Sequence, residues 1–527
     1  MIKYIKGASG MKATHRVKDS TGQTVGFIVD DSFYTEQYIR SNVQYIDNLY
    51  LSGFEIVTGD EELAEIDYRA AVNDREYDRL VTNNPFERDI QKDFSAWKDD
   101  RLHKVLQLEG SRQIGKTTEL LKFAYKNYEY VIYVNLANDI YDFVTVTENG
   151  CKPLEFEKYC LRAGLPHFMN NKNTILVIDE IQISEKVYNS IRGLQSAVSC
   201  DIVVTGSYLG QTIRANYFLP AGTVSYIHMY PLCFQEFCRI FGKEELLMEI
   251  DLFGGSNDAK YNELTELYQI YRQIGGYPEI IKRYRETGNI SRCYDEIENI
   301  LETFEKESGN YFQNSKEPLI FKTVYTEAIK CMCHEKQGSG SKLVETVTTL
   351  AKQSQKMLVS RDEVTNAISW LTYSGIIGEC GIYNNGDVSQ YIPARRLYYM
   401  DCGIAAYLGR QAEIPERDIT GLLTETFVFR ELNRLYGKNF SNRKVKGTTP
   451  CFSVWNQYEL DFMVVGTDNV VYGIEVKTTN GDPTSLRVFV DKGFVDKGIV
   501  AKMTKGGHGE KFDTIPIYTV GCRFPYI

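Results

Sequence analysis

The segment from Gly110 to Thr118 constrains the fold of this chain more than any other. It fits the pattern G-x-x-x-x-G-K-[ST], and it stands between the apolar run Val105–Leu108 and a helix pattern over Thr117–Tyr125. Glycines let backbone N–H groups surround phosphate oxygens, and the start of the helix adds positive potential. We therefore expect a phosphate-binding loop that holds ATP, formed by Gly110, Ser111, Arg112, Gln113, Ile114, Gly115, Lys116, Thr117 and Thr118.

Two side chains of this loop have separate expected roles. Lys116 would reach the β- and γ-phosphates, and the hydroxyl of Thr117 would be a ligand of Mg²⁺. A chance match to the pattern is the alternative, and the strand–loop–helix context argues against it.

A second motif, Thr174–Glu180, is an apolar strand pattern that ends in two acids. Beside a phosphate loop, Asp179 would hold Mg²⁺ through its water shell, and Glu180 would orient or deprotonate the attacking water. The alternative is a strand capped by two solvated acids. One strand later, Ser207 would contact the γ-phosphate as a sensor, unless Thr205–Ser207 is a simple turn.

The strand and helix patterns divide the chain into four expected parts. Residues 1–85 favour a small α+β unit with a hairpin around Ser20–Gly22 and a helix over Phe33–Leu51. Short apolar runs alternate with helix patterns from 86 to 285, which is typical of an α/β ATPase domain with a parallel sheet. Residues 286–415 are mostly helical, and a β pair near Asn384–Gly386 suggests a winged helix. Residues 416–527 combine a helix with several strands.

Composition and charge bound the possible partners and location. No stretch approaches the roughly 18 to 20 apolar residues of a membrane helix, and Met1–Gly10 is polar, so we expect a cytoplasmic protein with no membrane partner. The net charge is −10. Residues 1–100 hold 12 basic and 19 acidic residues, whereas residues 430–527 hold 14 and 10. The C-terminal part is therefore best able to approach nucleic acid, although an ordinary mixed surface has a similar balance.

A series of motifs in fixed order resembles a known family. After the phosphate loop and the Asp-Glu strand come V-V-T-G-S, Y-P-L-C-F-Q-E-F (230–237), G-G-Y-P (275–278) and D-C-G (401–403). Over about 86–527 the series is similar to prokaryotic AAA-type ATPases, of the archaeal and STAND-like group, that carry a C-terminal domain of unknown function. The resemblance implies an ATPase core, a winged-helix region and a nuclease-like C-terminal domain.

One departure from the family puts fast ATP turnover in doubt. Family members often have Gly-Arg ahead of the P-L-x-F-x-E-F segment, where this chain has Gly222-Thr223. An arginine that neutralises the γ-phosphate is missing there. Arg214, Arg272 or a second subunit of a homo-oligomer could supply one.

Four residues near the end of the chain are similar to the PD-(D/E)XK nuclease core. Asp461 precedes the strand Val471–Lys477, which carries Glu475 and Lys477 on one face. Asp461 and Glu475 would bind Mg²⁺ or Mn²⁺, Lys477 would orient the nucleophile, and Glu425 matches an acid on the first helix. E-x-K alone is a weak signal, since acids and lysines alternate on many solvated strands.

Two functions follow from these motifs. The first is an ATPase whose nucleotide state controls a metal-dependent nuclease acting on nucleic acid, with a defence or mobile-element role by family analogy. The second is an ATP-dependent switch that binds DNA or a protein without cleaving nucleic acid, with residues 1–85 as the protein-binding arm. A motor such as a helicase lacks a basic, aromatic-rich channel.

Overall fold

The computed structural model describes residues 15–18, 24–29, 32–35, 55–58 and 68–523, apart from 101–103, 166–167, 207–221, 251–252, 254–257, 312–316, 335–339, 356–359, 384–394, 437–449, 467–469 and 479–480. The chain divides into two compact units. The first contains residues 1–109 and 115–227, and the second contains residues 110–114 and 228–527.

The first unit begins with a four-stranded antiparallel sheet in the order β3-β2-β1-β4. Its strands are β1 (His15–Lys18), β2 (Thr24–Val29), β3 (Ser32–Thr35) and β4 (Glu55–Thr58). The expected hairpin is confirmed, because β1 pairs with β2. The helix expected over Phe33–Leu51 is wrong at its start, where Phe33 pairs with Ile28 in this sheet. Residues 36–51 lie outside the described part of the chain.

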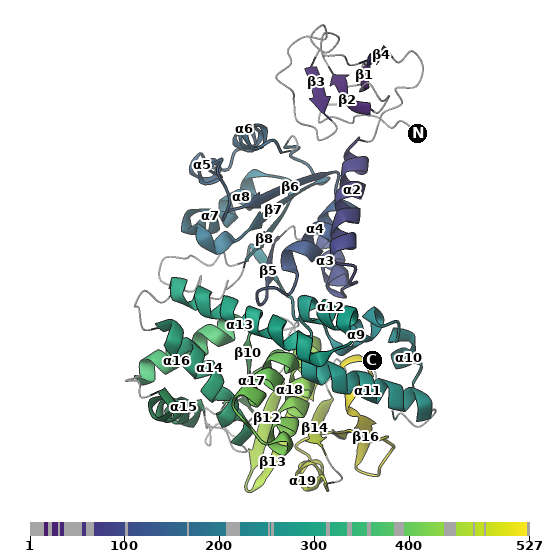
Figure 1. The fold of residues 1–527 in the computed structure, drawn as a ribbon, viewed down its shortest axis with the longest axis vertical. Helices are drawn as coiled ribbons and strands as arrows, with labels where there is room; N and C mark the ends of the chain where they lie inside the picture. Colours follow the sequence, from purple (N-terminus) through teal and green to yellow (C-terminus); the bar gives the residue numbers. More distant parts are fainter. Residues whose placement is uncertain are drawn as a thin grey trace. The chain divides into compact units, whose positions relative to one another are not determined.

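The main sheet of the first unit has five described strands in the order β6-β7-β8-β5-β9, of which Figure 1 labels β5 to β8. They are β5 (Val105–Glu109), β6 (Tyr130–Asn135), β7 (Thr174–Asp179), β8 (Asp201–Thr205) and β9 (Val224–His228). The pairs β6–β7, β7–β8 and β8–β5 are parallel. The near-complete burial of these strands explains why they are continuous apolar runs. The predicted α/β fold with a parallel sheet is confirmed, and β9 is an addition to the four predicted strands.

Helices cover both faces of this sheet (Figure 1). One face forms a large apolar core with α5 (Val144–Glu148), α6 (Pro153–Ala163), α7 (Glu185–Asn189) and α8 (Ile191–Ala197). The other face carries α2 (Tyr68–Asn83), α3 (Ile90–Asp99) and α4 (Lys116–Asn127). Asn73 of α2 donates a hydrogen bond to the carbonyl of Tyr128 at 2.7 Å. Helix α2 therefore packs with this domain, ahead of the boundary expected at 85/86.

The second unit starts with a series of helices. They are α9 (Phe234–Ile240), α10 (Glu244–Glu249), α11 (Asp258–Ile274), α12 (Pro278–Thr287), α13 (Ile290–Tyr311), α14 (Glu317–His334), α15 (Gly340–Gln355), α16 (Arg361–Tyr373), α17 (Cys402–Gln411) and α18 (Glu416–Tyr436). The predicted start of α16 is confirmed, because Ser360 and Glu363 form a reciprocal capping box.

A seven-stranded sheet completes the second unit, in the order β11-β10-β12-β13-β14-β15-β16. It contains β10 (Ile377–Ile382), β11 (Arg395–Tyr399), β12 (Cys451–Trp455), β13 (Tyr458–Val465), β14 (Val471–Lys477), β15 (Lys497–Lys502) and β16 (Phe512–Pro516). Helix α19 (Thr484–Asp491) packs on β13, β14 and β15. The short helices η5 (Ile517–Thr519) and α20 (Val520–Arg523) follow β16.

The hairpin expected to form a wing lies at one edge of this sheet. Strands β10 and β11 pair antiparallel, as predicted, but β10 also pairs in parallel with β12 through Gly381 and Ile382. The hairpin is therefore not a free-standing wing, and the boundary expected at 415/416 separates strands of one sheet. The further division into four domains stays a prediction.

Candidate functional site

The phosphate loop has the backbone geometry that its glycines predict. Strand β5 ends at Glu109, and α4 begins at Lys116. Gly110, Gln113 and Gly115 have φ angles of 142°, 59° and 91°. At Gly110 a Cβ would also lie 2.3 Å from the carbonyl oxygen of Met229. Both end positions therefore require glycine, and the predicted strand–loop–helix arrangement is confirmed.

Oxygen atoms that can bind a metal ion lie close together at the start of α4. The Thr117 hydroxyl donates to Asp179 Oδ2 at 2.8 Å, and the Tyr133 hydroxyl donates to the same oxygen at 3.0 Å. Burial and the neighbouring Asp179 raise the pKa of Tyr133, so it remains a donor. A hydroxyl beside a carboxylate is a hard-oxygen pair of the kind that Mg²⁺ prefers. The residues present therefore fit the magnesium of a bound nucleotide, and Lys116 is also buried here.

Gln182 is a neighbour of the expected catalytic acid that the sequence reasoning missed. Glu180 has a left-handed backbone with φ 53°, and its Oε2 accepts a hydrogen bond from Gln182 Nε2 at 2.5 Å. A Cβ at Gly206 would lie 2.0 Å from Gln182 Oε1, so Gly206 leaves room for this side chain. The motif I-D-E-I-Q carried the signal, because one 3₁₀ turn brings positions 180 and 182 together. Ser207 lies outside the described residues.

The arginine expected to compensate for Gly222-Thr223 is not identified. Gly222 has φ 80°, and Thr223 is buried. Arg214 lies outside the described residues. Arg272 lies on α11, where it interacts electrostatically with Tyr268 and Cys402. The source of such an arginine stays a prediction.

Three of the motifs that carry the family resemblance meet in the second unit. Gly276 N donates to Asp401 Oδ2 at 2.7 Å, and Leu232 N donates to the Gly276 carbonyl at 2.7 Å. Gly275 has φ 75°, and a Cβ there would lie 2.0 Å from Asp401 Oδ1. Burial raises the pKa of Asp401 to about 6, although backbone amides at Gly276, Ile404 and Gly403 oppose the shift. The segments 231–234, 275–278 and 401–403 thus form one packed junction.

The four candidate residues near the C-terminus lie together. Glu425 is on α18, Asp461 on β13, and Glu475 with Lys477 on β14. Asp461 Oδ2 accepts from Val476 N at 2.7 Å. Lys477 Nζ lies 2.6 Å from Glu475 Oε1, and Glu475 Oε2 accepts from Leu486 N at 2.9 Å. Antiparallel pairing of β13 with β14 places these side chains side by side.

Burial and mutual repulsion dominate the electrostatics of this carboxylate cluster. The pKa of Asp461 is raised to about 8, first by burial and then by Glu425, against the hydrogen bond from Val476. Burial also raises the pKa of Glu425. Burial acts to lower the pKa of Lys477, but Glu475, Asp461 and Glu425 outweigh it and raise the pKa. Lys477 and Arg396 partly compensate the negative charge here, and carboxylate oxygens are the kind of ligand that a divalent cation prefers.

Strand β11 supplies two further side chains that the sequence reasoning missed. Tyr398 OH donates to Glu425 Oε2 at 3.2 Å. Arg396 forms a buried ion pair with Glu459, and its charge opposes the raised pKa of Glu425 and of Asp461. The alternation of Arg396 and Tyr398 on one strand face was the available signal. It was overlooked because both precede the boundary expected at 416.

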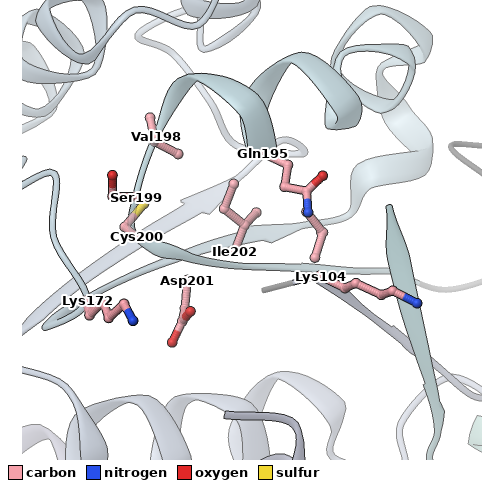
Figure 2. Close-up of a pocket in the computed structure, with 9 residues that line it drawn as sticks. Lys104, Lys172, Gln195, Val198, Ser199, Cys200, Asp201 and Ile202 are labelled. Carbon is pink, nitrogen blue, oxygen red and sulfur yellow. The ribbon is translucent and has the colours of Figure 1, made fainter. Parts of the chain in front are cut away.

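A cavity of about 330 Å³ lies elsewhere in the first unit (Figure 2). It opens beside Val105 and Asp201, the first residues of β5 and β8. Parallel strands place their amino ends at the edge opposite the phosphate loop. Tyr128 OH donates to Asp201 Oδ2 at 2.6 Å. The cavity therefore contains none of the predicted site residues.

Comparison with known families finds a match over the part of the chain that contains the phosphate loop. Residues 102–238 match the model of a family described as an AAA domain. The chain carries an AAA-type P-loop ATPase domain. Nucleotide binding is implied by that domain. Residues 265–414 match a second model, a domain of unknown function named DUF8612, which covers α12 to α17 and the β10–β11 hairpin.

One curated relative is an uncharacterized protein of Haemophilus influenzae. It is 25% identical over 193 residues, which are 35% of this chain and 42% of that protein. The match thus spans less than half the length of the curated relative.

Several solved structures are similar at low identity. A Walker-type ATPase of Pyrococcus abyssi is 12% identical, with a TM-score of 0.37 over 61% of this chain and 95% of that one. The Aeropyrum pernix ORC1 protein in complex with DNA is 15% identical, with a TM-score of 0.27 over 65% and 92%. The Thermotoga maritima RuvB Holliday junction branch migration motor is 14% identical, with a TM-score of 0.26 over 56% and 89%.

The helices were also compared with the requirements for crossing a membrane. Within the part of the chain that the structure describes, none combines the necessary length and apolar character.

Proposed function

We propose that this chain hydrolyses ATP and that its nucleotide state controls a metal-dependent, nuclease-like site acting on nucleic acid. The observation that carries the proposal is the gathering of Glu425, Asp461, Glu475 and Lys477 in the second unit of a chain that also has a complete phosphate loop. Side chains with perturbed pKa values cluster at functional sites, which supports a role for this group.

The ATPase half of the proposal uses groups at the start of α4 and the end of β7. Lys116 would contact the β- and γ-phosphates, while Thr117 and Asp179 would hold Mg²⁺. That ion would neutralise charge on the phosphates. Glu180 would orient the attacking water once it exchanges the hydrogen bond that it accepts from Gln182 for one that it accepts from that water.

The nuclease half uses the carboxylate cluster on α18, β13 and β14. Asp461 and Glu475 would hold Mg²⁺ or Mn²⁺ through their carboxylate oxygens, and the cation would replace the proton that burial favours on Asp461. The ion would supply an activated water and stabilise charge on the scissile phosphate. Lys477, already held by Glu475, would orient the nucleophile, and Glu425 would complete the negative site. The excess of basic residues over 430–527 would attract the nucleic acid.

Cleavage assays on the purified full-length chain test this proposal. DNA and RNA of several forms are incubated with Mg²⁺ or Mn²⁺, with and without ATP. We expect metal-dependent cleavage that Lys477→Ala abolishes and ATP hydrolysis that Lys116→Ala abolishes. Lys306→Ala is the matched control, because Lys306 pairs with Glu302 on the surface of the same unit and lies outside residues 430–527.

Two results would overturn the nuclease assignment. One is undiminished cutting by Lys477→Ala. The other is ATP hydrolysis without cleavage of any substrate with either metal, which would leave a switch that binds DNA or a protein partner.

A further inference from the structure

Two buried hydrogen bonds and one partly buried hydrogen bond link the phosphate loop to the carboxylate cluster, and all three lie within the second unit. They join the loop to the Gly-Gly-Tyr-Pro segment, that segment to the end of β11, and β11 to α18. The loop residues Gly110–Ile114 belong to this same unit.

The first link joins Tyr277 to the phosphate loop. Tyr277 OH donates to Ser111 Oγ at 3.2 Å, and Tyr277 is only 1% exposed. Tyr277 precedes α12, whose first residue, Pro278, fixes the direction of the helix. Gly375 also lies close to the loop, where an added Cβ would be 3.4 Å from Ser111 N. A phosphate that draws in the loop amides would therefore displace Tyr277 or break this bond.

The second link is the bond from Gly276 N to Asp401 Oδ2 at 2.7 Å. Gly276 has no room to move aside, since an added Cβ would lie 2.2 Å from the Leu232 carbonyl oxygen. Gly403 is equally tight against the Ile274 carbonyl. A displacement of Tyr277 therefore reaches Asp401, because close-packed interiors transmit small shifts.

The third link starts from β11, which ends at Tyr399, two residues before Asp401. On this strand Tyr398 is buried and donates to Glu425 Oε2 at 3.2 Å. Its ring also stacks on Phe429 of α18, with centroids 4.8 Å apart. Tyr398 therefore sets the position of the Glu425 carboxylate relative to Asp461.

We infer that Tyr398 is a positioning residue for Glu425 and that nucleotide in the phosphate loop acts on it through Tyr277 and Asp401. The effect on cleavage rests on the proposed function. The transmission of a shift from the phosphate loop to Glu425 depends only on the hydrogen-bonded residues. It assigns β11, which lies ahead of the last expected domain, as the element through which ATP would regulate the carboxylate cluster.

Hydrogen exchange on the full-length chain tests the coupling without relying on cleavage. Exchange is measured with and without a non-hydrolysable ATP analogue and Mg²⁺ in wild type, Tyr277→Phe and Tyr398→Phe. A neutral hydrogen bond changes an equilibrium by roughly two- to tenfold. In wild type we expect the analogue to change exchange over 395–401 and 416–436 by about that factor. Tyr277→Phe should bind the analogue but lose this response.

Tyr261→Phe is the matched control, because Tyr261 OH donates to the Met503 carbonyl at 3.1 Å in the same unit, away from these links. It should keep the wild-type response. If Tyr277→Phe does not fold, Ser111→Ala removes the same bond from its other side. The inference is overturned if the saturated wild type shows no change over β11 and α18, or if Tyr277→Phe responds as wild type does.

Cleavage rates separate this inference from the proposed function. With an active nuclease, Tyr398→Phe should lower kcat about two- to tenfold with little change in KM, as expected when a hydroxyl that positions another group is removed. Tyr277→Phe should cut at one rate with or without ATP. If wild type never cleaves but shows the exchange response, the proposed function fails and the coupling stands.

Discussion

In the proposed ATPase mechanism, Glu180 is the residue whose state would most directly limit ATP hydrolysis. Its left-handed backbone turns the carboxylate toward Gln182, which donates to it at 2.5 Å. An oxygen that already accepts this bond is a poorer acceptor for a proton from water. The arrangement fits a resting enzyme in which Gln182 competes with the attacking water.

Replacing Gln182 with Ala should therefore raise the basal ATPase rate. Loss of one competing neutral hydrogen bond corresponds to an increase of about two- to tenfold in kcat. Phosphate release under saturating ATP measures it, with Glu180→Gln as the inactive reference. A fall in kcat for Gln182→Ala would mean that Gln182 assists hydrolysis instead of restraining it.

The buried carboxyl of Asp401 should make stability depend on pH. Its pKa rises on folding from 3.8 to about 6, mainly through burial. Between these values the folded chain holds more protons than the unfolded chain, so this group's contribution to stability falls as pH rises from about 4 to about 6. Asp401→Asn lacks the titration and cannot accept from both Gly276 and Ile404.

We expect Asp401→Asn to have the lower Tm throughout, with the difference from wild type shrinking between pH 5 and pH 6. Above pH 7 the difference should be constant. Thermal unfolding across this range measures it, and a difference that widened with pH would contradict the sign of the shift.

At the scale of elements, the turn between α11 and α12 depends on the absence of a side chain at Gly276. Gly276→Ala would place Cβ 2.2 Å from a backbone oxygen that cannot move independently. We expect a destabilisation of about 1–3 kcal/mol or more, as for overpacked sites. Gly421→Ala on α18 is the control: its Cβ would meet nothing within 4 Å, so it should stabilise the helix by about 0.5–1 kcal/mol.

Denaturant unfolding of the two variants provides the comparison. Equal stability of Gly276→Ala and wild type would show that the turn tolerates a shift of the Leu232 carbonyl.

Local patterns predicted single elements well, because their causes are local. The capping box at Ser360 and the strand Val471–Lys477 were placed correctly. The pairing of β10 with β12 was not predictable from one sequence, since nothing near Ile382 indicates Phe452 as its partner. The candidate sites followed the same rule. Most residues within motifs were found, although Gln182 was missed two positions from Glu180, whereas Tyr398 contacts a partner that only the fold brings near.

At the scale of the whole molecule, the seven-stranded sheet joins segments on both sides of residue 416. A fragment of residues 416–527 would leave β12 without β10 and expose an open strand edge with buried residues such as Phe452. We expect this fragment to aggregate. A fragment of residues 360–527 retains the β10–β11 pair and should give a larger soluble fraction. Sedimentation of the two expressed fragments tests this, and equal solubility would contradict it.

The shared sheet also bears on how such a chain can change in evolution. Recombination favours breakpoints that keep hydrogen-bonded strands together, and the stretch after α17 is no such breakpoint here. An exchange that replaced only residues 416–527 would pair foreign strands with the resident β10 and would separate Glu425 from Tyr398. The segment that can be exchanged as a unit therefore begins at or before β10. Such an exchange would carry β11 together with α18, and so keep Tyr398 with Glu425.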